Sequence, residues 1–201
     1  KGRNCKVLDE LIELFMKKES IPDTCEFPEA KPYLESYDFP AHILTDELLR
    51  KSLQLDRLKS IRDKLKARVS LEEKDDIQIR YFAPWNDSDL IQEGSVDMVY
   101  SQAVMEHIDN LGFAYKTLNK WLKVGGFMSH QIDFKSHGTA KEWNGHWKYS
   151  DSAWEKIKRN KVYLLNREPY SAHVNYMKQN GFRIIYENKI RNASEKRNAI
   201  G

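Results

Sequence analysis

The stretch that decides the fold is Gly94-Ser-Val-Asp-Met-Val-Tyr-Ser-Gln-Ala-Val-Met-Glu-His-Ile108, followed by Trp121-Leu-Lys-Val-Gly-Gly-Phe-Met-Ser-His130. The short apolar run after Gly94 predicts a strand that is covered on both faces. Apolar residues then recur at steps of three and four, which predicts a helix: Val104, Ile108, Leu111, Tyr115, Leu118 and Leu122. We expect Gly125-Gly126 to end that helix and to lead into a second strand over 127–134. Such a unit places the loop 101–107 at the carboxyl edge of a parallel sheet, where ligands bind in open α/β folds.

Two parts of this stretch resemble class I S-adenosylmethionine-dependent methyltransferases. Residues 96–108 are similar to the fourth strand of that family and to the loop after it, which often ends in Glu-His, as Glu106-His107 does here. Residues 121–127 resemble the Pro-Gly-Gly turn before the fifth strand, with Val124 in place of the proline. The resemblance covers roughly residues 77–190. It implies an α/β fold, a Rossmann-like three-layer sandwich with a mainly parallel sheet, to which this chain adds a helical, proline-rich insertion.

The chain departs from the family in its glycines. In the family, the first strand ends in an acidic residue and a Gly-x-Gly-x-Gly loop that cradles the methionine part of the cofactor. This chain has nine glycines, and none lies in such a pattern. The chain also begins at Lys1 without a methionine. We therefore expect a fragment or processed product that lacks the first βαβ unit and is inactive alone; the alternative is a relative that has lost cofactor binding.

Composition bounds the class of protein. The length of 201 residues and the hydrophobic content of 40% suit one α/β domain with a real core. The net charge of +3 is too small to indicate nucleic acid. No apolar run approaches the ~20 residues that a membrane helix needs. Cys5 and Cys25 lack metal-ligand spacing, which favours free thiols in the cytoplasm over a single disulfide. The expected partner is a small molecule, and the sequence leaves an oligomer open.

The chain divides into three predicted parts. Residues 1–76 form a helical and proline-rich segment, residues 77–190 the α/β core, and residues 191–201 a polar tail. The first part is expected to hold a helix over 4–18, an ordered loop or lid over 20–40, helices from a cap at Thr45 to about 68, and a turn over 72–76. The core is expected to add strands over 77–82 and 182–187, a helix from Ser150 to about 160, and a helix over 173–180 that is capped by Ser171 and closed by Gly181.

The resemblance implies two cofactor-binding segments. The loop 83–87 follows the equivalent of the third strand, and it would flank the adenine through Ala83, Trp85 and Asn86. Trp85 would stack on the base; the alternative is that it packs the loop against a helix. At the end of the next strand, backbone groups would approach the methionine part of S-adenosylmethionine at Ser101, Gln102 and Ala103.

The remaining candidates concern the acceptor. His107, Asp133 and His137 could remove a proton, since histidine has an ordinary pKa of ~6.5, close to neutrality; a structural role for His107 is the alternative. Trp143, Asn144 and His146 combine flat apolar surfaces with hydrogen-bonding tips, which suits a sugar; an aromatic plug that fastens the loop is the alternative. The histidines lack the close pairs of common zinc sites, so no metal site is expected.

These observations lead to one functional hypothesis with two rivals. The hypothesis is a methyltransferase domain that moves the methyl group of S-adenosylmethionine to an oxygen, nitrogen or carbon of a small polar acceptor, such as a sugar or glycan intermediate. One rival is a non-catalytic scaffold or interaction domain of the same fold. The other is a different α/β enzyme, such as a nucleotide-sugar enzyme, because fold alone does not fix function.

Overall fold

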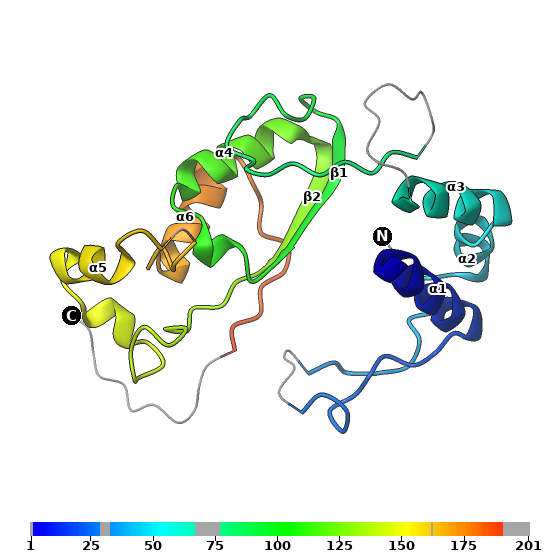
Figure 1. The fold of residues 1–201 in the computed structure, drawn as a ribbon, viewed down its shortest axis with the longest axis horizontal. Helices are drawn as coiled ribbons and strands as arrows, with labels where there is room; N and C mark the ends of the chain where they lie inside the picture. The colour runs from blue at the N-terminus through cyan, green and yellow to red at the C-terminus, as the bar shows by residue number, and fades with distance from the viewer. Residues whose placement is uncertain (1, 29–32, 67–76, 162, 191–201) are drawn as a thin grey trace. The chain divides into compact units, whose positions relative to one another are not determined.

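The computed structural model describes residues 2–28, 33–66, 77–161 and 163–190. The chain forms two compact units, Lys1–Ala83 and Pro84–Gly201 (Figure 1). The predicted turn over 72–76 and the predicted tail over 191–201 lie outside the described residues. Within the described ranges, no helix is long and apolar enough to cross a membrane.

The described part of the first unit is helical, as the sequence predicts. It contains α1 (Gly2–Lys17), α2 (Asp46–Ser52) and α3 (Leu55–Lys66). Thr45 caps α2, and its hydroxyl accepts a hydrogen bond from the backbone N–H of Leu48 at 3.3 Å. Asp9 of α1 forms an ion pair with Arg62 of α3. Cys5 and Cys25 are both free thiols.

The segment over 20–40 is a loop where it is described, in agreement with its prolines. The N–H of Ile21 donates to the carbonyl of Tyr37 at 2.7 Å, so the two ends of this loop are joined. The rings of Phe15 and Phe39 meet edge to face, 6.3 Å apart, and attach the loop to α1. Its role as a lid stays a prediction.

The strand predicted over 77–82 is wrong. These residues are irregular, and their large apolar side chains stay exposed, Tyr81 to 85%. Alternating residues form a strand only where a partner strand takes up the backbone hydrogen bonds and one face is buried. Neither condition is met for this segment among the residues that the structure describes.

The second unit is built on a βαβ arrangement. Strand β1 (Val96–Gln102) leads to helix α4 (Leu111–Trp121) and then to strand β2 (Leu122–Gln131), which pairs with β1 in parallel. The fold is therefore mixed α/β, with a two-stranded parallel sheet in the described part of the chain. The larger Rossmann-like sandwich stays a prediction.

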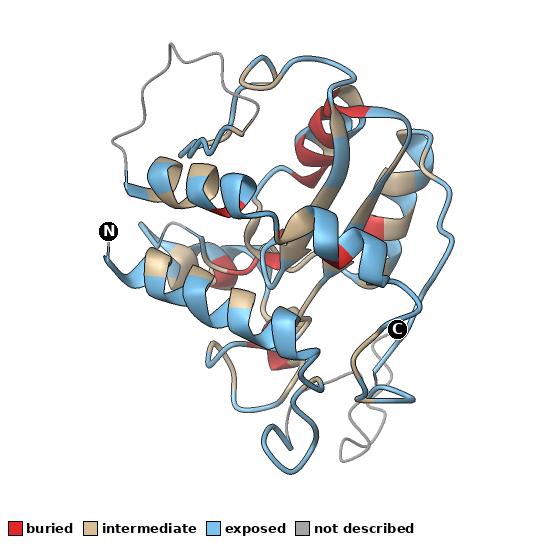
Figure 2. Cartoon of the chain, turned by 90° about the vertical axis from the view of Figure 1, so that its right-hand side faces the viewer, coloured by how far each residue is buried: buried red, intermediate tan, exposed pale blue. Residues whose placement is uncertain are grey.

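The core lies on one face of this sheet. Its buried members come from α4 and the turn before it: Met105, Leu111, Ala114, Tyr115, Leu118 and Trp121. Figure 2 colours the buried residues of the chain red. Val96 and Val99 pack partly against this cluster. Met98 and Tyr100 point the other way, and Tyr100 is 64% exposed. The expectation that β1 is covered on both faces is therefore wrong for the described chain.

Helix α4 begins later than its apolar pattern predicts. The residues before it form a short 3₁₀ helix, η1 (Met105–His107), so Glu106-His107 lie in a separate turn rather than at the start of α4. The side-chain oxygen of Asn110 accepts a hydrogen bond from the N–H of Phe113 at 2.9 Å. This hydrogen bond makes Asn110 the N-cap, so α4 starts at Leu111. Asparagine favours this position because its side chain bonds the backbone N–H groups that have no partner within the helix.

The glycine pair lies inside β2 instead of ending the helix. Strand β2 starts directly after α4, and its register against β1 slips between two pairs, Val96 with Leu122 and Met98 with Phe127. Gly125 has a φ of +82°, a backbone conformation that residues with a side chain rarely adopt. A Cβ on Gly126 would lie 3.1 Å from the carbonyl oxygen of Asp97. The pair therefore permits a β-bulge and a close approach of the two strands.

The last helices agree with the sequence except at one cap. Helix α5 (Asp151–Lys158) is capped by Ser150, whose hydroxyl accepts from the N–H of Ala153 at 3.3 Å. Helix α6 (Tyr170–Gln179) follows Pro169, so the predicted cap Ser171 lies within the helix. Proline fixes a φ that suits the start of a helix, and this explains the earlier start.

Gly181 closes α6 as predicted, with a φ of +79°. The N–H of Phe182 then donates to the carbonyl of Met177 at 3.0 Å. The strand predicted over 182–187 is wrong: this segment is irregular, and Ile185 and Tyr186 are exposed because no neighbouring strand covers them in the described chain.

Candidate functional site

The three residues predicted to be catalytic come together beyond the carboxyl ends of β1 and β2. His107 lies in η1 after β1, and Asp133 and His137 follow β2. The Nε2 atom of His137 lies 3.4 Å from an Asp133 carboxylate oxygen. The rings of His107 and His137 meet edge to face, 5.4 Å apart. Two imidazoles and a carboxylate in contact can take up and pass on a proton.

Glu106 is the main site residue that the sequence analysis missed. Its side chain is buried, with 3% of the residue exposed, and neither carboxylate oxygen has a hydrogen-bond partner of normal geometry among the described residues. Burial raises the pKa of Glu106, although backbone N–H groups at Glu106 and Asp133 lower it in part. The sequence shows the Glu-His pair, but the ordinary pKa of histidine singles out only His107 as a base; the burial of Glu106 carries no sequence signal.

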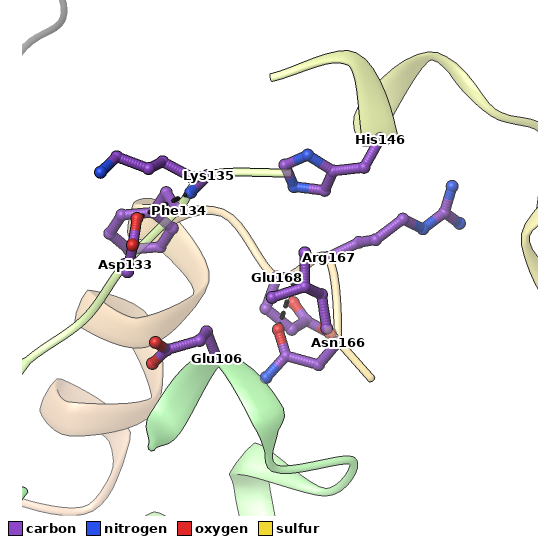
Figure 3. A pocket seen from close by; sticks show the side chains of 9 residues that line it. Glu106, Asp133, Phe134, Lys135, His146, Asn166, Arg167 and Glu168 are labelled. Atoms are coloured by element: carbon purple, nitrogen blue, oxygen red, sulfur yellow. Dashed lines mark hydrogen bonds between the residues drawn. The ribbon is translucent and has the colours of Figure 1, made fainter. Parts of the chain in front are cut away.

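A small, open hollow of about 10 Å³, with room for about one water-sized group, lies beside Glu106 (Figure 3). Its walls come from η1, from the segment after β2, from η2 (Gly145–Lys148) and from the loop before α6. The lining residues are Glu106, Asp133, Phe134, Lys135, His146, Leu165, Asn166, Arg167 and Glu168. Charged and polar side chains therefore dominate a hollow that can receive a small polar group.

Asn166 holds the Glu106 turn in place. Its side-chain nitrogen donates to the carbonyls of Met105 and Ile108 at 2.8 and 2.9 Å. Its backbone N–H donates to the carbonyl of Glu106 at 2.8 Å, and its side-chain oxygen accepts from the N–H of Glu168 at 2.8 Å. Three hydrogen bonds thus fix the backbone on both sides of the buried carboxylate, and the fourth holds the Asn166 side chain to its own loop.

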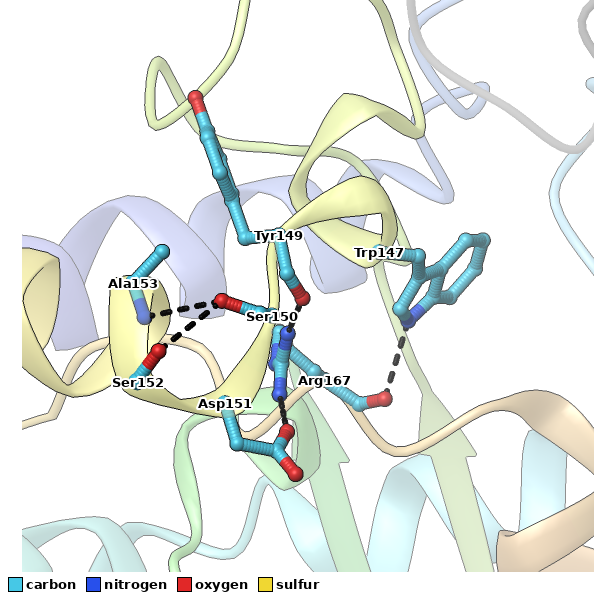
Figure 4. A network of polar contacts seen from close by, with 7 residues as sticks. All are labelled: Trp147, Tyr149, Ser150, Asp151, Ser152, Ala153 and Arg167. Atoms are coloured by element: carbon cyan, nitrogen blue, oxygen red, sulfur yellow. Dashed lines mark hydrogen bonds and ion pairs between the residues drawn. The ribbon is translucent and has the colours of Figure 1, made fainter.

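Arg167 is engaged away from the hollow. Its guanidinium donates to the carbonyl of Tyr149 at 2.7 Å and to a carboxylate oxygen of Asp151 at 2.5 Å (Figure 4). The same group lies over the Trp154 ring, 5.1 Å from its centre. The carbonyl of Arg167 accepts from the Trp147 indole at 2.9 Å. Arg167 therefore fastens the aromatic segment and does not neutralise Glu106.

Three non-glycine residues around the site have a left-handed backbone. Ala103 at the end of β1 has a φ of +50°, His137 of +48° and Arg167 of +61°. Such conformations cost free energy for residues with a Cβ, and they gather at functional sites where the surrounding structure imposes them.

The predicted substrate residues are only partly brought to the hollow. His146 lines it, is 2% exposed, and has its pKa lowered to about 4 by burial, with a smaller effect of Arg167. Trp143 packs edge to face on Trp147 at 6.3 Å, and the carbonyl of Asn144 accepts from the N–H of Trp147 at 3.2 Å. Trp143 and Asn144 are absent from the lining, and their packing agrees with the plug alternative.

The predicted cofactor residues are not brought together. Trp85 packs against Trp121 with ring centres 6.0 Å apart, near the start of β1, which agrees with the packing alternative. Asn86 is exposed, and Ala83 is the last residue of the first unit. Ser101–Ala103 lie at the other end of β1.

The side chains at the carboxyl end of β1 already have partners. Ser101 contacts Nδ1 of His130 at 2.7 Å, and Gln102 accepts from the Tyr100 hydroxyl at 2.9 Å. The described residues therefore do not form a complete cradle for S-adenosylmethionine. Within the same ranges, no group of three or more His, Cys, Asp and Glu side chains is arranged to hold a metal ion.

Comparison with protein-family models, with curated proteins and with solved structures gives no match for this chain. The chemistry of the site must therefore be argued from its own residues.

Proposed function

We propose that the second unit is an S-adenosylmethionine-dependent methyltransferase domain that binds a small polar acceptor at the carboxyl edge of β1 and β2. The observation that supports it is the meeting of His107, Asp133 and His137 at that edge. Of these three residues, Asp133 also lines the hollow with the buried carboxylate of Glu106. The carboxyl edge of parallel strands is the usual ligand site in α/β folds.

The residues at hand can prepare an acceptor for attack. A hydroxyl or amine becomes more nucleophilic when a base removes its proton, and His107 or His137 is the base that this site offers. Asp133 lies beside the His137 ring, where it can orient the imidazole and stabilise its charged form. S-adenosylmethionine would supply the methyl group, but the described residues form no complete cradle for it. Acceptor binding and proton removal are thus the roles assigned to this chain.

A non-catalytic scaffold is the second candidate. The contact of Trp85 with Trp121 and the engagement of Arg167 with Asp151 and Trp154 show that much of the aromatic content is used in packing. A scaffold does not need the cluster of His107, Asp133 and His137 for its role. Whether this cluster is required for activity therefore distinguishes the two functions.

The test is a methyl-transfer assay with the full chain. Millimolar S-adenosylmethionine and a panel of monosaccharides and amino sugars are incubated with the protein, and S-adenosylhomocysteine is measured by mass spectrometry. Because the described residues form no complete cradle for S-adenosylmethionine, we expect only slow turnover, at this high cofactor concentration, with at least one acceptor. His137→Ala should reduce turnover at least about tenfold, equal to about 1.4 kcal/mol of transition-state stabilisation. Asn144→Ala is the matched control and should retain turnover, because Asn144 belongs neither to the lining of the hollow nor to the cluster of His107, Asp133 and His137.

Absence of turnover with every acceptor, in a protein that is folded and saturated with cofactor, would favour the scaffold. Equal turnover in wild type and His137→Ala would show that the cluster does not take part.

A further inference from the structure

We propose that the hollow beside Glu106 recognises a positively charged amino group, so that its ligand is a small amine such as an amino sugar. This inference rests on the proposed function in one respect, because it names the acceptor class for the same site. It can still be tested without cofactor.

Glu106 is a buried carboxylate whose burial is not fully compensated. A buried carboxylate normally has hydrogen-bond partners, and an isolated buried charge is costly. Neither oxygen of Glu106 has a hydrogen-bond partner of normal geometry among the described residues, and backbone N–H groups at Glu106 and Asp133 compensate its burial only in part. The residue is only 3% exposed and lines the hollow. Three hydrogen bonds of Asn166 hold the turn so that this carboxylate cannot easily move out to water. An unpaired acceptor is thus kept ready in a fixed position.

A second feature is the balance of charge in the hollow. Three carboxylates line it, those of Glu106, Asp133 and Glu168, together with two cations, Lys135 and Arg167. Arg167 is paired with Asp151, and Figure 3 shows its side chain running away from Glu106. Lys135 is exposed, and its side chain also extends away from Glu106 in Figure 3. The lining therefore has one more carboxylate than cations, and both cations extend away from Glu106.

An amino group and a hydroxyl differ in how well they can pair with Glu106. A hydroxyl can donate one hydrogen bond to Glu106 but leaves the charge uncompensated. An ammonium offers three donors and a full positive charge, so it can pair with Glu106 and reach a second acceptor as well. The neighbouring His146 is buried with Nδ1 unpaired in the described structure, and it offers such a second polar contact.

The test compares glucosamine with glucose, which differ in one amino group. Each sugar is titrated into the labelled full chain without S-adenosylmethionine, at a pH at which the amine is protonated, and affinity is measured by NMR. We expect glucosamine to bind at least about tenfold more tightly than glucose. A hydrogen bond to a charged group contributes at least the free energy that corresponds to a tenfold change in affinity. Glu106→Gln should abolish the preference and keep the shape of the site. Glu155→Gln, an exposed carboxylate on α5, should leave it unchanged.

Asp133→Asn is a second variant, in case Glu106→Gln alters folding, and it should weaken the preference in the same direction. Equal affinity for both sugars, or a preference that survives in Glu106→Gln, would overturn the inference, and so would the absence of binding. Selective glucosamine binding without methyl transfer would support the inference while the proposed function failed.

Discussion

Acid should destabilise the second unit through His173, and the size of the effect follows from its surroundings. His173 on α6 is 1% exposed, and its Nδ1 contacts the Tyr115 hydroxyl at 3.0 Å. The ring also meets the edge of Phe134 at 5.6 Å. Burial, with a smaller contribution from His130, lowers the pKa of His173 from 6.5 to about 4. The native state thus binds fewer protons than the unfolded state between these two values.

The sign of the effect is therefore fixed. The stability that His173 contributes is fully present above pH 6.5 and is lost as the pH falls through about 4. The difference between the pKa values of His173 in the unfolded and native states corresponds to about 3 kcal/mol in the free energy of unfolding. His173→Asn retains a polar group near Nδ1 but does not titrate. Between pH 7 and pH 4, the free energy of unfolding of this variant should therefore fall by about 3 kcal/mol less than that of the wild type. His42, exposed and in the first unit, gives the matched control variant His42→Asn.

The assay is urea unfolding followed by tryptophan fluorescence at several values from pH 7 to pH 4. All five tryptophans lie in the second unit, so the signal reports that unit alone. If the pH dependence of His173→Asn equals that of the wild type, the assignment of a buried, neutral His173 is refuted.

Three further predictions concern packing around the site. Trp85→Ala should lower the free energy of unfolding of the second unit by about 2 kcal/mol, because it removes a half-buried ring from Trp121; unchanged stability with weaker S-adenosylmethionine binding would instead support stacking on adenine. Gly126→Ala should cost about 1–3 kcal/mol in the same assay, since its Cβ would crowd two backbone carbonyls and Leu122; a neutral result would mean that the bulge can relax. Asn166→Ala should lower the melting temperature and weaken glucosamine binding together, as the Glu106 turn loses its hydrogen bonds; loss of stability alone would argue against its positioning role.

The sequence predicts those elements whose signals are local. The cap at Thr45, the helix start at Ser150 and the closing Gly181 mark helix ends, and the structure confirms all three to within one residue. The parallel pairing of β1 and β2 also follows from the strand–helix–strand pattern. The strands predicted over 77–82 and 182–187 fail, because strand formation depends on a partner that alternation alone does not supply.

The same limit applies to the site. His107, Asp133 and His137 could be grouped from the sequence, because the loops after parallel strands meet at one edge. The importance of Glu106 depends on its burial and on the clamp from Asn166, which is 60 residues further along the chain and carries no motif. Contacts of this kind arise only from tertiary packing.

The most direct test of the account is to map where a small polar ligand binds. Backbone amide signals of the labelled full chain are followed by NMR during a titration with glucosamine. The account predicts that the largest changes fall on three segments around the hollow, residues 103–107, 133–137 and 165–168, and on His146. Changes confined to the exposed face of β1 around Met98 and Tyr100, or no changes at all, would contradict it and leave the carboxyl edge as a packed aromatic plug.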